Sequence, residues 1–467
     1  MRKAALVAGI VLLALGLKAC PTGSTATIVP IDEMPSLWYV YREYFPVGNI
    51  IANRHRNDFT NIRRMELLGH HFNLLTAENE MKPNEVRIGA SYPGSWSFGN
   101  ANALMAFAGN NGFRFHGHTL AWHSQSPRWL AHNVTPAVAE TRLRYHIGHV
   151  MRHFGNGVES WDVLNEVIMS GGPGVTNVDI FGNELGNVND GGRGFPMAAG
   201  TPLDTTVLPW DDWDWRIALR TPANVPNETD WPAAINVPTY NETCFVRIAF
   251  EEARSVNSGL IRYYNDYNLN IPRKRLAVYH MVRDINGGVP AEPGDGLIQA
   301  VGMQAHYWLP GVSGGPGSRP GWVHVQDVRD SMVRFASLGV YVSITELDVF
   351  AGPGREMDQA VMYARLFDLF RQFALERRFD EDTDRERSVL RRVTIWGVDD
   401  PSSWRTQYSP LLFDAVGNPK QAFWAVADPL AFLLEHAPQY ANEFANDCFR
   451  CFAFDPATCP HEPRRIP

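Results

Sequence analysis

The chain has 467 residues, of which 45% are hydrophobic and 20% are charged, and its formal net charge is −8. This composition is typical of a soluble globular protein, and the negative charge argues against a nucleic-acid-binding protein and for a neutral ligand. The length suits one large barrel domain with insertions and tails. The 14 tryptophans are the compositional outlier. Exposed tryptophans commonly stack on flat apolar ligands, and we expect at least half of the 14 to be core residues instead.

The N-terminus has the pattern of an export signal. Arg2 and Lys3 precede an apolar run at residues 4–17, which is too short for a membrane-spanning helix. Residues 17–20 (LKAC) resemble the cleavage box of a bacterial lipoprotein, in which Cys20 carries the lipid and attaches the protein to a membrane. Because a lysine is unusual in that box, simple cleavage nearby is an equal alternative. We expect an exported protein that is secreted, periplasmic or lipid-anchored at the cell surface.

Four further cysteines follow in the chain, Cys244, Cys448, Cys451 and Cys459. An even number of cysteines in an exported protein favours disulfides, whose pairing the sequence leaves open. The three cysteines near the C-terminus and His461 also form a C-x2-C-x7-C-x-H pattern with the ligand types of a zinc site. Export makes zinc the less favoured interpretation, and we predict no metal and no cofactor for the activity.

From residue 38 onwards, strand-like and helix-like segments alternate. Strands are predicted at Pro46–Ala52, His71–Leu75, Gly112–Leu120, Glu159–Val167, Leu260–Tyr264, Ile298–Ala305, Tyr341–Val349 and Arg392–Gly397. Helices are predicted at Phe59–Leu68, Ala101–Gly109, Thr135–Phe154, Phe245–Ala253, Arg273–Asn286, Val325–Leu338 and Met357–Arg378. This alternation implies right-handed crossovers and a parallel sheet, and eight strands imply an α/β fold of the (β/α)8 TIM barrel type.

The domain organisation follows from this pattern. We expect a signal at residues 1–20, a linker at 21–37, a barrel at 38–430 and a Cys-containing tail at 431–467. A long insertion at residues 171–240 follows the fourth strand and is rich in Gly, Asn, Pro and Trp, including Trp210, Trp213 and Trp215. A loop of that length is either an elaborated surface loop or a wall of a substrate cleft, and both interpretations remain open.

Two glutamates stand where predicted strands end. Glu346 lies towards the end of the segment YVSITELDV (341–349), and Glu166 lies towards the end of the segment ESWDVLNEV (159–167). The carboxyl ends of barrel strands form the functional face of this fold. A lone glutamate at a strand end is commonly a solvated charge, but two at one face are the minimum set for glycoside hydrolysis.

The motifs at the strand ends resemble those of the glycoside hydrolase family 10 xylanases. In chain order they are TAENEMK, GHTLAWHSQSPRWL, WDVLNEV, YYNDYN, GMQAHY, ITELDV, TIWGVDDPSSWR and PLLFDAVGNPKQAFWA. The match runs from about Val47 to Asp428, with the insertion excepted. One such motif could arise by chance, whereas this number in family order is specific.

The resemblance implies a retaining, endo-acting enzyme on β-1,4-xylan. It assigns the general acid/base to Glu166 and the nucleophile to Glu346, supported by Asn165 at the sugar 2-hydroxyl and by His306 with Asp348 behind it. The residues that the resemblance assigns to substrate binding are Glu78, Asn79, Lys82, His118, Trp122, Gln125, Tyr267, Gln304, Trp396 and Trp404. The expected partners are xylan and xylo-oligosaccharides, no nucleic acid is expected, and we expect a monomer.

The proposed chemistry needs one protonated and one ionised carboxyl group, which retaining enzymes hold roughly 5 to 5.5 Å apart. Two alternatives remain. One is a related retaining barrel glycosidase that acts on another β-1,4-glycan, and the other is a non-catalytic xylan-binding protein. The long insertion departs from the family pattern just after the acid/base strand. The resemblance therefore does not determine the structure of the site on the leaving-group side.

Overall fold

The computed structural model describes residues 28–89, 91–130, 134–168, 177–178, 184–185, 245–290, 294–312, 323–375, 377–380 and 385–444. The predicted signal, all five cysteines and Trp210, Trp213 and Trp215 of the insertion lie outside these ranges. The predictions of lipidation, disulfides, tail zinc and an insertion wall therefore concern residues outside the described part. No helix within the described ranges is long and apolar enough to cross a membrane.

Eight parallel strands form a closed barrel. They are β1 (Val47–Ile51), β2 (Leu74–Ala77), β5 (Arg114–Gly117), β7 (Ser160–Asn165), β10 (Ile261–Asp266), β11 (Ala300–Met303), β13 (Tyr341–Phe350) and β16 (Leu390–Ile395). Each strand pairs in parallel with the next along the chain, and β16 pairs with β1 to close the barrel. The predicted TIM barrel is confirmed, and each of the eight predicted strands overlaps one barrel strand.

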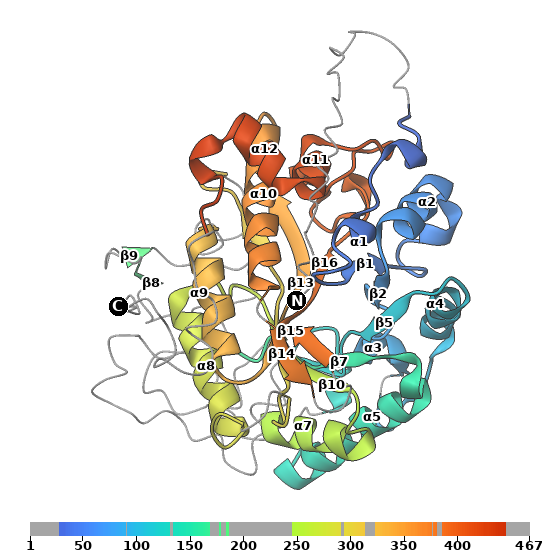
Figure 1. Cartoon of the computed structure of the whole chain (residues 1–467). Coiled ribbons are helices and arrows are strands. Elements are labelled where there is room, and N and C mark those ends of the chain that lie inside the picture. The colour runs from blue at the N-terminus through green and yellow to red at the C-terminus, as the bar shows by residue number, and fades with distance from the viewer. Residues whose placement is uncertain are drawn as a thin grey trace, which may run out of the picture.

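Helices surround the barrel. They are α2 (Ile62–His71), α4 (Gly99–Asn110), α5 (Pro136–Phe154), α7 (Phe245–Val256), α8 (Pro272–Ile285), α9 (Val325–Ala336) and α10 (Glu356–Phe373). Figure 1 shows these helices as a ring around the strands, with the colours following chain order around the ring. Local sequence sets several of their starts: the side chains of Asn61 and Thr135 accept bonds from the first turns of α2 and α5, as N-cap residues do.

Smaller elements decorate the barrel. The short helices are α1 (Leu37–Val40), α3 (Pro83–Val86), α11 (Gln421–Ala427) and α12 (Pro429–His436). The short strands are β3 (Arg87–Ile88), β4 (Ser95–Trp96), β6 (Ala121–Trp122), β8 (Asn177–Val178), β9 (Glu184–Leu185), β12 (His306–Trp308), β14 (Arg377–Asp380) and β15 (Arg385–Ser388). β6 extends the pairing of β7, and β12 extends that of β13. Both extensions lie at the carboxyl ends of the strands, where the candidate site was predicted.

Two predicted element boundaries are wrong. His71 was predicted to begin a strand, but it ends α2, where its buried ring packs against Phe413 and Phe423. The helix predicted at Met357–Arg378 ends at Phe373, and Arg377 begins β14, which pairs antiparallel with β15. In both places packing and strand pairing from distant segments decide the structure, which a local apolar pattern does not report.

The packed unit extends beyond both predicted domain boundaries. Within the predicted linker, Met34 and Leu37 are buried in the main core. Beyond residue 430, Phe432 and Leu433 of α12 are buried in a smaller cluster that also holds Ala360 of α10. These apolar side chains remove surface from water, so the segments that carry them are part of the folded unit.

Candidate active site

Glu166 lies directly after β7, at the carboxyl end of the barrel. Its backbone N–H donates to the carbonyl of Asn265 at 2.9 Å, which continues the pairing of β7 with β10 by one residue. Its φ is 56°, in the left-handed region that side-chain-bearing residues rarely adopt. Non-glycine residues in such conformations cluster at functional sites, where the surrounding structure holds them. The turn places the Glu166 side chain at the end of the strand rather than along it.

Three neutral groups donate to the carboxylate of Glu166. The indole N–H of Trp122 donates to Oε2 at 2.9 Å. The side-chain amides of Gln304 and Asn165 donate to Oε1 at 2.8 and 3.2 Å. The Nε2 atom of His123 lies farther away, at 3.8 Å from Oε2. Both carboxylate oxygens are thus oriented by donors from three different strand ends.

Glu346 occupies the middle of β13 and is held by a charged neighbour. Its Oε2 lies 3.1 Å from Nε2 of His306, whose Nδ1 lies 2.9 Å from Oδ1 of Asp348. Burial acts to lower the pKa of His306, but the Asp348 charge and its hydrogen bonds to both carboxylates raise that pKa to about 10. His306 is therefore a cation that donates to both carboxylates.

The charge of His306 affects both acids differently. Burial acts to raise the pKa of Glu346, but the hydrogen bond from His306 and the nearby His118 outweigh burial and lower that pKa. For Asp348, burial is the larger effect and raises its pKa, although His306 and a bond from Trp404 oppose it. Of these two acids, Glu346 is therefore the one whose pKa is lowered.

Asn265, at the end of β10, joins the two glutamates. Its Nδ2 donates to Oε1 of Glu346 at 2.8 Å and to Oδ1 of Asn165 at 2.9 Å. Its Oδ1 accepts from the hydroxyl of Thr345 at 2.6 Å. This arrangement requires Gly302 on the strand between, because a Cβ there would lie 2.4 Å from Oδ1 of Asn265. The glycine of the GMQAHY motif thus makes room for the amide that spans the site.

Two tryptophans and a histidine lie beside the His306 pair. The ring of Trp396 lies 5.5 Å from His118 and 6.5 Å from His306 in edge-on geometry. Trp404 donates from Nε1 to Oδ2 of Asp348 at 2.9 Å, yet its side chain remains 48% exposed. Its indole therefore lies at the edge of the site, partly exposed, with the guanidinium carbon of Arg405 4.2 Å from its ring centre.

His118 is fixed from within the barrel. Its Nδ1 lies 2.8 Å from Oδ2 of Asp162 on β7. Burial acts to raise the pKa of Asp162, but the charges and hydrogen bonds of His116 and His118 lower it well below its usual range. The carboxylate that orients His118 is therefore ionised.

A polar group follows β2 and β5. Nζ of Lys82 donates to Oδ1 of Asn79 at 2.9 Å and lies 5.0 Å from the ring centre of Trp122. Nε2 of Gln125, a residue with φ of 46°, donates to the same Oδ1 atom at 3.4 Å. Glu78 forms its ion pair with a residue outside this group, Arg56. Lys82, Asn79, Gln125 and Trp122 form one connected surface that continues from Glu166.

Tyr267 is the predicted site residue whose described contacts lie apart from the two glutamates. Nζ of Lys274 lies 3.4 Å from the centre of its ring, and its backbone N–H donates to Oδ1 of Asp266 at 2.8 Å. Lys274 also pairs with Asp266 at 2.6 Å. Burial raises the pKa of Asp266 to about 6 despite the charge of Lys274. The buried pair holds the position of the Tyr267 ring.

Apart from Glu78, whose described ion pair is with Arg56, the other predicted site residues are connected around Glu166 and Glu346 by the contacts described above. Three further residues complete the arrangement: Asn265, Asp162 and Arg56. Asn265 lies in the YYNDYN motif, and its position near a predicted strand end already favours a functional role from sequence. Asp162 lies in the WDVLNEV motif, where its inward place on the strand is the signal that could have identified it. Arg56 lies on a loop without any such pattern. Within the described ranges, no group of three or more His, Cys, Asp or Glu side chains has a geometry that could hold a metal ion.

Comparisons with known proteins agree with this geometry. The family model for glycosyl hydrolase family 10 matches residues 36–189 and 238–429. A β-1,4-xylanase of Dictyoglomus thermophilum is 30% identical over 403 residues, which cover 84% of this chain and 91% of that protein. Endo-1,4-β-xylanase A of Thermotoga maritima is 28% identical over 421 residues, but the match covers only 31% of that longer protein.

Solved structures show the same fold. The intracellular xylanase TsXylA of Thermoanaerobacterium saccharolyticum, in a mutant complex with xylotetraose, has a TM-score of 0.60 and 26% identity, covering 84% of this chain and 98% of that one. A xylanase from termite gut with a bacterial Ig-like domain has the same TM-score of 0.60 and 26% identity, covering 85% and 78%. With the family model matched over most of its length, the chain belongs to glycosyl hydrolase family 10 and is a glycoside hydrolase.

Proposed function

We propose that the protein is a retaining endo-1,4-β-xylanase that acts by double displacement. The observation that carries the proposal is the pairing of Glu346 with a cationic His306, together with a second glutamate, Glu166, that accepts hydrogen bonds from the neutral side chains of Trp122 and Gln304. Retaining hydrolysis needs one carboxylate that stays ionised and one that exchanges a proton. The names of the relatives supply the substrate, xylan.

In the first step, the ionised Oε atom of Glu346 attacks the anomeric carbon while Glu166 donates its proton to the glycosidic oxygen. The bond to the leaving sugar breaks and a covalent glycosyl-enzyme forms. His306 donates to Oε2 of Glu346 and Asn265 donates to Oε1. These two bonds fix the plane of the carboxylate before the sugar arrives, which lowers the entropy cost of reaching the transition state.

In the second step, Glu166 has lost its proton and acts as the base for an incoming water. The water attacks the anomeric carbon, the bond to Glu346 breaks, and the configuration is retained. The donors Trp122 and Gln304 remain in place on Glu166 in both steps. Both donors can therefore keep the Glu166 carboxyl group oriented while it gives up and takes back its proton.

Asn165 is suited to bind the sugar 2-hydroxyl. Its Oδ1 accepts from Asn265 and Gln304, so its orientation is set, and one N–H of its Nδ2 donates to Glu166. The second N–H is then available to a hydroxyl oxygen beside the anomeric carbon. Bonds to that hydroxyl strengthen in the transition state of glycosidases.

Xylose-specific binding on the non-reducing side would come from the group that follows β2 and β5. Lys82 and Gln125 share the Oδ1 atom of Asn79, which fixes three polar side chains at once. Glu78 and these three residues can donate to and accept from neighbouring hydroxyls of a second sugar. Tyr267 and the exposed face of Trp404 would line the remaining walls.

Side-by-side assays test the substrate. Reducing-sugar release should be highest on xylan and low on β-glucan and β-mannan at equal enzyme concentration. Higher activity on glucan or mannan would replace xylan as the substrate and leave the chemistry standing. Absence of hydrolysis on all three polymers, with retained xylan binding, would instead support a non-catalytic xylan-binding protein.

The stereochemical outcome tests the mechanism. Proton NMR of xylotetraose digestion should show the β-anomer of the product first, before mutarotation. Initial α-anomer would mean inversion, which also predicts a carboxyl separation of roughly 6.5 to 9.5 Å rather than 5 to 5.5 Å.

Export is part of the proposal and rests on the N-terminal sequence alone. The apolar run that follows Arg2 and Lys3 supports it, with Cys20 as the lipid attachment point in one of the two alternatives. Mass spectrometry of the mature protein would give its first residue. An N-terminal lipid-modified cysteine would select the anchored form, whereas an intact N-terminus would remove export from the proposal.

A further inference from the structure

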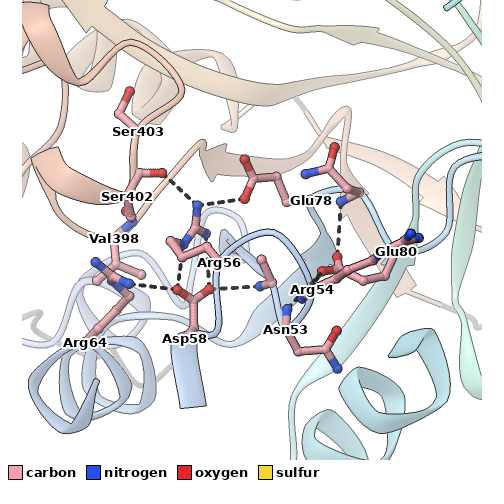
Figure 2. A network of polar contacts seen from close by, with 12 residues as sticks. Asn53, Arg54, Arg56, Asp58, Arg64, Glu78, Glu80, Val398, Ser402 and Ser403 are labelled. Atoms are coloured by element: carbon pink, nitrogen blue, oxygen red, sulfur yellow. Dashed lines mark hydrogen bonds and ion pairs between the residues drawn. The ribbon is translucent and has the colours of Figure 1, made fainter. Parts of the chain in front are cut away.

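The loop between β1 and α2 carries an arginine that contacts both neighbouring loops. β1 lies between β2 and β16 in the barrel, so the loop after β1 is flanked by the loops after those two strands. Arg56 contacts both. Its Nη1 lies 2.7 Å from Oε2 of Glu78 and donates to the carbonyl of Ser402 at 2.8 Å (Figure 2). Arg56 therefore links the predicted substrate residue Glu78 to the loop that carries Trp404.

The guanidinium of Arg56 is held in place from behind. Its Nε and Nη2 donate to the two oxygens of Asp58 at 2.6 and 3.1 Å. Such a two-point contact fixes the plane of an arginine head group. Asp58 is itself 2% exposed, and it accepts from the N–H of Ala52 at 2.8 Å and from Arg64 at 2.9 Å. Arg64 in turn donates to Asp399 at 2.8 Å. The contact to Glu78 thus ends a chain of fixed charges.

The charges that face Glu78 come from two segments, the loop after β1 and the loop after β2. Burial acts to raise the pKa of Glu78, and Arg56 and Lys82 oppose burial, while Asp58 and Glu80 add to it; the net effect is a raised pKa. Glu80 is occupied elsewhere, since its Oε1 accepts from the N–H of Asn53 at 2.8 Å. Figure 2 shows that the Arg56 contact engages one oxygen of Glu78 and that the other points away from the network. That second oxygen is placed to accept from a ligand hydroxyl.

We propose that Arg56 is a positioning residue that aims the carboxylate of Glu78 at the second sugar on the non-reducing side and so sets the affinity for substrates with two or more sugars there. The inference rests on the proposed function, because it assumes that Glu78 binds xylose. Arg56 acts through Glu78 and has no direct part in breaking the glycosidic bond. Its loss should weaken binding of the longer substrate and spare the reaction at a single sugar.

Two matched substrates separate these effects. For Arg56→Gln, kcat/KM on an aryl β-xylobioside should fall about tenfold, mainly through KM, as expected for a lost charged hydrogen bond. On an aryl β-xyloside, which places one sugar before the bond, the change should stay within about twofold because remote contacts serve only longer substrates. Arg56→Lys keeps the charge without the planar fork and should give an intermediate loss.

The pH profile supplies a second readout. Without Arg56, burial raises the pKa of Glu78 further, so the carboxylate takes up a proton at higher pH. The loss on the xylobioside should therefore be larger at pH 5 than at pH 8. A parallel loss on both substrates, at every pH, would overturn the proposal and reduce Arg56 to a structural ion pair.

Arg54→Gln is the matched control, because Arg54 lies on the same loop but pairs with Glu85 instead of Glu78. Arg54→Gln should leave the ratio of kcat/KM between the two substrates unchanged, and a shift equal to that of Arg56→Gln would also overturn the proposal.

Calorimetric binding of xylotriose gives a measure independent of turnover. If the parent protein binds xylotriose without hydrolysing xylan, the proposed function fails, and a roughly tenfold weaker affinity in Arg56→Gln would still support the role of Arg56. Unchanged affinity would overturn it.

Discussion

The two glutamates of the site lie on neighbouring parts of one barrel face, but their surroundings differ in charge. Glu346 is 5% exposed and contacts the cation His306, whose other nitrogen contacts Asp348. Glu166, with a side chain 14% exposed, receives bonds from the neutral groups of Trp122 and Gln304. The carboxylate of Glu346 is oriented by a charged donor, and that of Glu166 is oriented by neutral donors.

This difference matches the two tasks that retaining hydrolysis requires. The cation beside Glu346 favours its ionised form, which suits the proposed role of nucleophile. The donors to Glu166 from Trp122 and Gln304 are neutral, so they orient this carboxyl group without placing a charge against it. Similar orientation with different charge therefore allows two chemically identical side chains to take opposite roles.

The largest effect should follow loss of the charged member. In Glu346→Ala both steps lose their nucleophile, so kcat should fall about 10⁴-fold or more on xylan and on an activated aryl xylobioside alike. Thermal melting should confirm that the variant is folded. If the aryl substrate kept more than a few per cent of the parent activity, Glu346 would not be the nucleophile.

Loss of Glu166 should be selective for the leaving group. Glu166→Ala removes the general acid, so turnover of xylan should fall by about 10² to 10⁴-fold. An aryl xylobioside with an acidic phenol needs little protonation, so its first step should persist and the glycosyl-enzyme should accumulate as a kinetic burst. Azide should then restore turnover and yield a β-xylosyl azide. Equal loss on both substrates, without azide rescue, would contradict the assignment.

The charge on the Glu346 side should be visible in the pH profile. The acid limb of kcat/KM reports protonation of the free nucleophile. Because His306 lowers the pKa of Glu346, His306→Gln should move this limb upward by about 1 to 3 pH units. His123→Gln is the matched control near Glu166, at 3.8 Å from its Oε2, and should leave the acid limb in place. An acid limb that shifts in the control but not in His306→Gln would reverse the comparison.

Much of the barrel could be predicted from sequence because its signals are local. Strands such as β7 and β13 are rich in apolar residues, and each predicted strand overlaps a barrel strand. Asn165 ends β7 as expected, whereas β13 continues past Glu346 to Phe350. Element ends that depend on distant partners were not predictable. His71 is the example. It ends a helix, and its ring packs against Phe413 and Phe423, which follow β16 in the chain.

The candidate site shows the same division. Motif residues such as Gln304 and Trp122 were predicted because the resemblance covers them, and the structure places them on Glu166. Arg56 was not predicted, because its role arises only when the loop after β1 lies between two others in space. Charge differences between Glu166 and Glu346 also require three-dimensional neighbours, since both glutamates end similar strands in the sequence.

The smallest expected effect sharpens the comparison on the charged side. Trp404 donates a hydrogen bond to Asp348, and His306 lies between Asp348 and Glu346 and contacts both. Trp404→Phe keeps an aromatic ring over the site but removes this bond, which acts to lower the pKa of Asp348. A more basic Asp348 draws the Nδ1 proton of His306 toward itself, which weakens the positive charge beside Glu346. The acid limb of kcat/KM should therefore move upward by less than one pH unit. A single neutral hydrogen bond is worth about 1 kcal/mol, so kcat/KM should fall no more than about fivefold. Measuring both quantities separates the roles of this indole: a loss in KM with a fixed acid limb would mean that Trp404 acts on the sugar directly, through its exposed face, and not through Asp348.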